Sequence, residues 1–164
     1  MSTGLAAFTL FHVILSLAGI LAGFVVVLGF LSDKRLDGWT AVFICTTALT
    51  SLTGYLFPFH KVLPSHILGA LSLIALAIAI YARYQKHLDG GWRKSYVVSS
   101  VVALYFNVFV LIAQLYMKVP ALKAIAPTQT EAPFKITQLT ALVFFVVLGV
   151  LCTVRFRDER LRTA

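Results

Sequence analysis

Residues 5 to 31 read LAAFTLFHVILSLAGILAGFVVVLGFL, and this stretch decides the fold class. It contains no Asp, Glu, Lys or Arg, and it exceeds the run of about 20 apolar residues that a helix needs to cross a bilayer core. It is also too long for the apolar region of a secretory signal peptide, and no basic residue precedes it. The stretch therefore predicts a retained membrane-spanning helix.

Four more apolar stretches follow along the chain, over residues 39–57, 66–84, 96–116 and 134–154. The 164 residues are 60% hydrophobic and only 12% charged, and the mean hydropathy is +0.92. Polar residues are thus too few to cover the surface of a soluble domain. Because the five stretches and their connections use nearly the whole chain, we predict a single all-α domain over residues 1–164, a transmembrane bundle of five helices.

Basic residues gather at alternate connections between these stretches. One side of a five-helix bundle would hold ten of them: Lys34, Arg35, Arg83, Lys86, Arg93, Lys94, Arg155, Arg157, Arg160 and Arg162. The other side would hold four: Lys61, Lys118, Lys123 and Lys135. Lys and Arg accumulate in cytoplasmic loops, so we predict the N-terminus outside and the C-terminus in the cytoplasm. Since the charges sit at helix ends, the net charge of +8 gives no reason to expect nucleic-acid binding.

Polar side chains within apolar stretches mark the faces by which membrane helices pack. In an antiparallel bundle, most of them fall in the outer half, and six are candidate ligand-binding residues: His12, Tyr55, His66, Asn107, Gln114 and Gln138. The long fourth connection would cover them with Gln129 and Glu131. This arrangement predicts either a pocket for an apolar ligand, such as a quinone or a lipid, or a docking surface for another membrane protein.

Histidines raise two further hypotheses for the same region. His12 and His66 lie on different helices at compatible depth, so they are candidate axial ligands of haem b. His12, His60 and His66, with Glu131, are candidate ligands of a single metal ion. Haem is disfavoured because His66 lies within one turn of the end of its helix. The metal site is disfavoured because a proline-containing turn separates His60 from His66. A histidine hydrogen-bonded to a neighbouring helix is the simpler interpretation of His12.

Small residues in the apolar stretches indicate packing. Gly19 and Gly23 form a GxxxG pair, which favours close contact inside the bundle over a dimer interface. Cys45 and Cys152 have no CxxC spacing, so we interpret them as small hydrophobic side chains.

Three segments carry a family resemblance: residues 34–40 (KRLDGWT), 53–60 (TGYLFPFH) and 119–134, which begins VPAL and ends APTQTEAPF. Through them the chain resembles a family of small, uncharacterised multi-spanning inner-membrane proteins of proteobacteria. The resemblance covers most of the chain and implies a bacterial inner (cytoplasmic) membrane location. It implies no biochemical activity.

The sequence favours a non-enzymatic function. No nucleophile–base pair and no paired carboxylates are visible, and ion-coupled carriers usually have more helices, arranged as repeats. Small hydrophobic chains with short loops are typical of accessory or assembly subunits. We therefore expect an accessory or partner-binding subunit of a bacterial membrane complex, in contact with the lipid bilayer and with other membrane-protein subunits. The alternative is a binder of quinone, lipid or haem b in an outer-half pocket.

Overall fold

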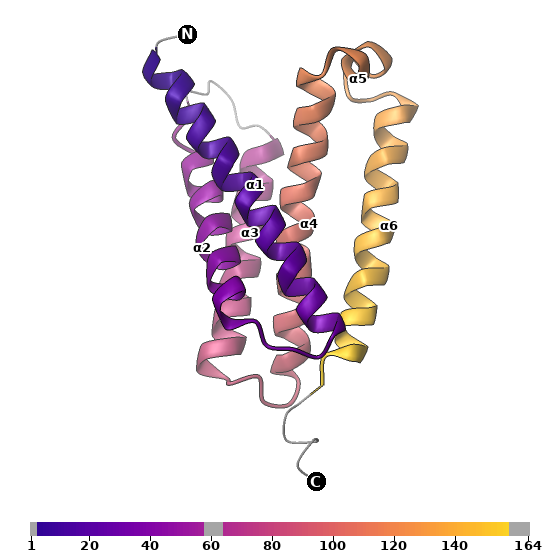
Figure 1. Ribbon diagram of the computed structural model, residues 1–164. Helices are drawn as coiled ribbons and strands as arrows, with labels where there is room; N and C mark the ends of the chain where they lie inside the picture. Colours follow the sequence, from indigo (N-terminus) through magenta and orange to yellow (C-terminus); the bar gives the residue numbers. More distant parts are fainter. Residues whose placement is uncertain (1–2, 58–63, 158–164) are drawn as a thin grey trace.

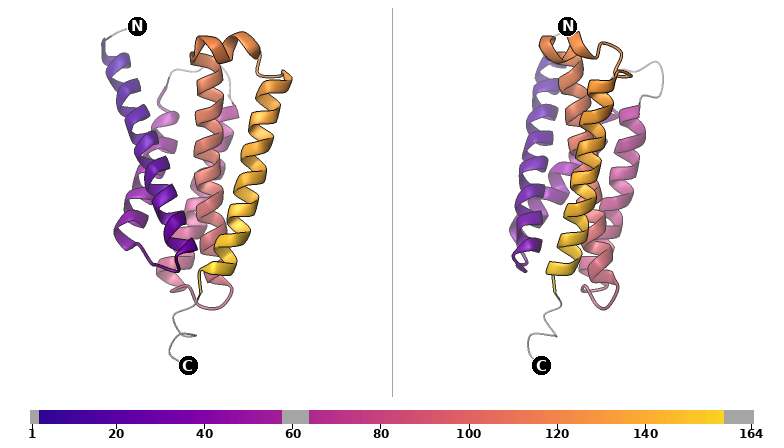
Figure 2. Two further views of the ribbon diagram at one scale, coloured as in Figure 1. Left: turned by 45° about the vertical axis from the view of Figure 1, so that its right-hand side comes forward. Right: turned by 90° about the vertical axis from the view of Figure 1, so that its right-hand side faces the viewer.

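The computed structural model describes residues 3–57 and 64–157 and is helical throughout, with no β-strand in those ranges (Figure 1). Its elements, in chain order, are α1 (Thr3–Leu31), α2 (Asp37–Gly54), α3 (Pro64–Ile80), the π-helix η1 (Tyr81–Gln85), α4 (Trp92–Lys118), α5 (Pro120–Ile125) and α6 (Ala132–Arg155). The long helices lie side by side in one bundle, with the start of α1 and the short α5 at the same end (Figures 1 and 2).

Four segments of the described chain are long and apolar enough to cross a membrane: α1, α3 continued by η1, α4 and α6. The prediction of an all-α, multi-pass membrane protein is therefore confirmed. α2 is not among the four. It has 18 residues, begins at Asp37 and carries several threonines and a serine, so it is less apolar than its neighbours. The fifth crossing stays a prediction.

Helix ends differ from the expected ones where local hydrogen bonds decide them. α2 ends at Gly54 rather than at residue 57, because the Tyr55 and Leu56 N–H groups donate to carbonyls only three residues back. α4 begins four residues early, at Trp92, so its first turn carries charged residues beyond the apolar run. Pro120 opens the short helix α5 from a position that favours proline.

α4 is the central helix of the bundle, since it packs against α1, α3 and α6, while α1 pairs with α2. Close approach of α1 depends on its glycines. A Cβ atom at Gly23 would lie 2.7 Å from Leu104 Cδ1 and 2.9 Å from Phe43 Cε2, and one at Gly19 would lie 3.1 Å from Thr46 Oγ1. The GxxxG pair therefore packs inside the bundle, against α2 and α4.

Candidate functional site

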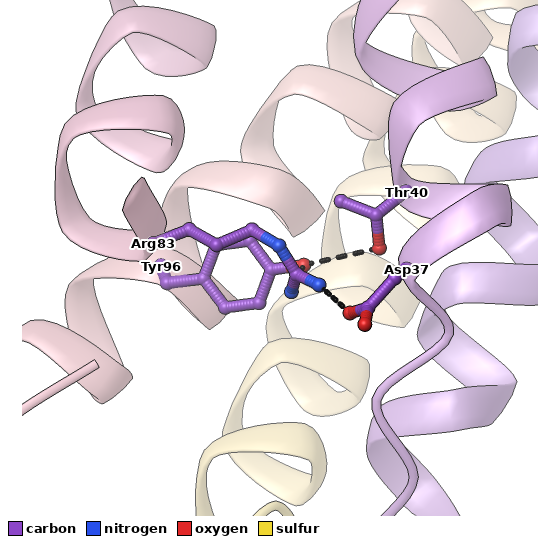
Figure 3. Close-up of polar contacts among 4 residues, drawn as sticks. All are labelled: Asp37, Thr40, Arg83 and Tyr96. Atoms are coloured by element: carbon purple, nitrogen blue, oxygen red, sulfur yellow. Dashed lines mark hydrogen bonds and ion pairs between the residues drawn. The ribbon is translucent and has the colours of Figure 1, made fainter. Parts of the chain in front are cut away.

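A buried arginine joins three elements at the end of the bundle where α2 and α4 begin (Figure 3). Arg83 lies in η1 and is only 4% exposed. Its Nη2 donates to the Asp37 carboxylate in the first turn of α2, and its Nη1 donates to the Tyr96 hydroxyl of α4 at 2.9 Å. Thr40 Oγ1 lies 3.3 Å from the same hydroxyl. The guanidinium carbon is also 5.2 Å from the centroid of the Tyr96 ring, within cation–π range.

This cluster links α2, the long helix that is not among the four apolar spans, to η1 and α4. A guanidinium removed from water requires hydrogen-bond partners and a counter-charge, and Tyr96 and Asp37 supply them. Tyr96 is fully buried, whereas the Asp37 side chain is 75% exposed. We infer that the cluster fixes the start of α2 against η1 and α4.

This role of Arg83 is not predicted from the sequence. The charge pattern predicts Arg83 to be a loop cation that sets topology, but the structure buries it in η1. One signal was available: Arg83 lies inside the apolar stretch that ends at Tyr84, and a charge in such a position needs a partner.

A second arginine ties α4 to the end of α6. Arg93 Nη1 donates to the Thr153 carbonyl oxygen at 3.2 Å and to the Phe156 carbonyl oxygen. Unpaired carbonyls at a helix C-terminus attract cations and donors. Arg93 thus caps α6 from a neighbouring helix.

Among the predicted ligand-binding residues, His12 is bonded to α2. Its Nδ1 lies 2.8 Å from Thr53 Oγ1. The Thr53 hydroxyl also lies 2.7 Å from the Leu49 carbonyl oxygen, and the His12 tautomer decides which member of the His12–Thr53 pair donates. The His12 ring also meets the Phe57 ring edge-on, with centroids 5.1 Å apart. This agrees with the simpler interpretation of His12 as a helix–helix contact.

Tyr55 and His66, both predicted for the pocket, contact each other. The Tyr55 hydroxyl donates to the His66 carbonyl oxygen at 2.5 Å, and the two rings lie 5.5 Å apart. His12 and His66 therefore pack on different aromatic rings, Phe57 and Tyr55.

The predicted amide side chains bridge other helix pairs. Asn107 Nδ2 donates to Thr47 Oγ1 at 3.1 Å, joining α4 to α2, and Gln138 Nε2 donates to the Phe109 carbonyl at 3.1 Å, joining α6 to α4. Gln138 Oε1 is buried without a hydrogen-bond partner in the described chain. Gln114 is half-buried on α4. His12, Asn107, Gln138 and the Tyr55–His66 pair thus make separate helix contacts.

The loop between α5 and α6 is held to α4 and to itself. Gln129, at φ +60°, donates from Nε2 to the Ala113 carbonyl at 2.7 Å. Glu131 accepts from the backbone N–H groups of Thr128 and Thr130 and from the Thr128 hydroxyl. Desolvation would raise the pKa of Glu131, but these hydrogen bonds lower it below its ordinary value.

Within the described residues, no group of three His, Cys, Asp or Glu side chains could hold a metal ion. His60 lies outside those residues, so the predicted ligand set is described only in part.

The structure adds an apolar groove between α4 and α6, about 250 Å³ in volume and open on one side. Its lining residues are Val98, Val101, Val102, Tyr105, Leu142, Phe145, Val146, Gly149 and Val150. It extends from the middle of α4 toward the start of that helix. None of the eight residues predicted for the pocket and its cap lines it.

No family model, curated protein or solved structure matches this chain. The resemblance to small inner-membrane proteins of proteobacteria therefore stays a prediction.

Proposed function

We propose that this protein is a non-catalytic accessory subunit of a bacterial inner-membrane complex, and that it binds its partner through one face of α6. The supporting observation is that face, here called the α6 outer face: Ile136, Val143, Val147 and Val154, which are 52–70% exposed. Their spacing of seven, four and seven residues places them on one stripe of the helix. α6 also has the smallest share of buried residues among the four spans. In its most apolar 18 residues this share is 22%, against 44% for α1 and α4.

Polar side chains inside the bundle are hydrogen-bonded to neighbouring helices, and this supports a role other than catalysis. His12 is bonded to Thr53, and Asn107 to Thr47. Polar side chains that bond across membrane helices contribute to association of the helices. Side chains so engaged serve packing, which leaves the exposed helix faces as the surfaces for recognition.

The proposal includes five crossings, with α2 as the fifth, the N-terminus outside and the C-terminus in the cytoplasm. α2 packs beside α1 and α3, and the Arg83–Asp37 pair holds its start at the end where η1 lies. Reporter fusions at both ends test the topology. A cytoplasmic N-terminus would contradict it.

A photo-crosslinking residue at Val147 tests the α6 outer face in native membranes. We expect one defined protein to be crosslinked at Val147. The matched control is Leu21 on α1, which is 67% exposed and should crosslink only to lipid. Lipid adducts alone at both positions would contradict a partner on α6.

One observation favours the second candidate, an apolar ligand in the outer half of the bundle. Gln138 Oε1 is buried, has no hydrogen-bond partner among the described residues and could accept a hydrogen bond from a ligand hydroxyl. Quinone or lipid retained by the purified protein and lost in Gln138→Met would support this candidate over the docking surface.

A further inference from the structure

Basic side chains stand at one end of the groove between α4 and α6. Lys94 is exposed and lies one turn before Val98, on the face of α4 that lines the groove. Arg93 reaches from α4 to the carbonyls of Thr153 and Phe156 at the end of α6. Thr153 follows Gly149 by one turn, so Arg93 spans the two helices just beyond the groove.

Arg93 retains donors for an anion. A guanidinium carries five N–H groups, and the two contacts with α6 use Nη1 alone. Nε and Nη2 have no acceptor among residues 3–57 and 64–157. Asp33 approaches the same corner, but its carboxylate accepts a hydrogen bond from the Arg157 backbone N–H at 2.8 Å.

We propose that the groove binds one acyl chain of an anionic phospholipid, whose phosphate contacts Arg93 and Lys94. α4 and α6 are both long and apolar enough to cross a membrane, so the groove between them opens toward hydrocarbon chains. Tyr105 is the one lining residue with a polar side chain. Charge complementarity at the basic end selects an anionic headgroup over a zwitterionic one.

The lining of the groove favours an acyl chain over a quinone head. The groove has a volume of about 250 Å³, and its lining residues other than Tyr105 are apolar. A flexible hydrocarbon chain can lie along such an open groove, whereas the two carbonyl groups of a quinone head would find only one polar lining side chain, that of Tyr105.

The test is native mass spectrometry of the purified chain released from nanodiscs containing equal amounts of phosphatidylglycerol and phosphatidylcholine. We expect one phosphatidylglycerol to be retained in preference to phosphatidylcholine. Lys94→Gln should reduce this preference about fivefold, because a basic residue near an anionic headgroup contributes about 1 kcal/mol. Lys123→Gln, on α5 at the other end of the bundle, is the charge control and should leave the preference unchanged.

The acyl chain is tested by filling the groove. Gly149→Leu should abolish retention, whereas Gly149→Ala should preserve it, since a Cβ atom there lies 3.6 Å from Val101 Cγ1, an ordinary contact. Val102→Phe fills the groove from α4 and serves if Gly149→Leu does not fold. Equal retention of the two lipids, equal effects of the two lysine variants, or unchanged retention in a folded groove-filled variant would each overturn the proposal.

Discussion

Arg83 and Asp37, 46 residues apart, form a hydrogen-bonded ion pair in which the arginine is buried and the carboxylate faces outward. The Arg83 side chain is 4% exposed and that of Asp37 is 75% exposed. The asymmetry matters because loss of Asp37 would leave a buried positive charge without its counter-charge. Loss of an exposed cation nearby, such as Lys34, would leave no buried charge without its counter-charge.

We expect Asp37→Ala to destabilise the protein by about 1–3 kcal/mol, between the values for exposed and buried pairs. The readout is the thermal unfolding midpoint in detergent. Lys34→Ala is the matched control, since Lys34 is exposed at the same end of the bundle. Equal midpoints for the two variants would show that the pair does not anchor α2.

Gly23→Ala should destabilise the bundle by about 1–3 kcal/mol, the usual cost of overpacking. The added Cβ would lie 2.7 Å from Leu104 Cδ1 and 2.9 Å from Phe43 Cε2. Gly4→Ala on the same helix is the control, because no heavy atom lies within 4 Å of its Cβ position, and alanine there should be neutral or stabilising. A destabilised Gly4→Ala variant with an unaffected Gly23→Ala variant would contradict the packing of α1.

Gln138→Met should leave stability unchanged or raise it slightly. The variant loses a hydrogen bond to the Phe109 carbonyl, worth about 0.6 kcal/mol between membrane helices, but removes a buried Oε1 that has no partner in the described chain. Asn107→Leu should be the more harmful change, because it leaves the fully buried Thr47 hydroxyl without its donor. Denaturant titration in mixed micelles measures both, and the reverse ranking would contradict this account.

Glu131 should make the α5–α6 loop sensitive to acid. Its folded-state pKa lies below the ordinary value of 4.5, so its stabilising effect is present above that value and is lost as pH falls through the folded-state pKa. NMR of the Thr128 and Thr130 amides, which donate to the carboxylate, should show a transition below pH 4.5. Glu131→Gln should remove the transition. A midpoint above pH 4.5 in the unaltered protein would contradict the hydrogen-bond network.

The sequence by itself determined the class of this protein and its helices. Long uncharged runs such as residues 5–31 can be satisfied in lipid only as helices, since every backbone hydrogen bond then closes within the segment. It also placed Gly19 and Gly23 at a packing face. These conclusions depend on local composition and spacing, which a linear chain displays directly.

Only the tertiary structure decided which side chains meet. The depth of each polar residue along its helix could be estimated from its position, but its rotation relative to a neighbouring helix could not. The structure accordingly pairs His12 with Thr53 and Gln138 with the Phe109 carbonyl, and it buries Arg83 against Tyr96. The groove between α4 and α6 likewise depends on how two helices far apart in sequence approach each other, and no spacing within either helix encodes that approach.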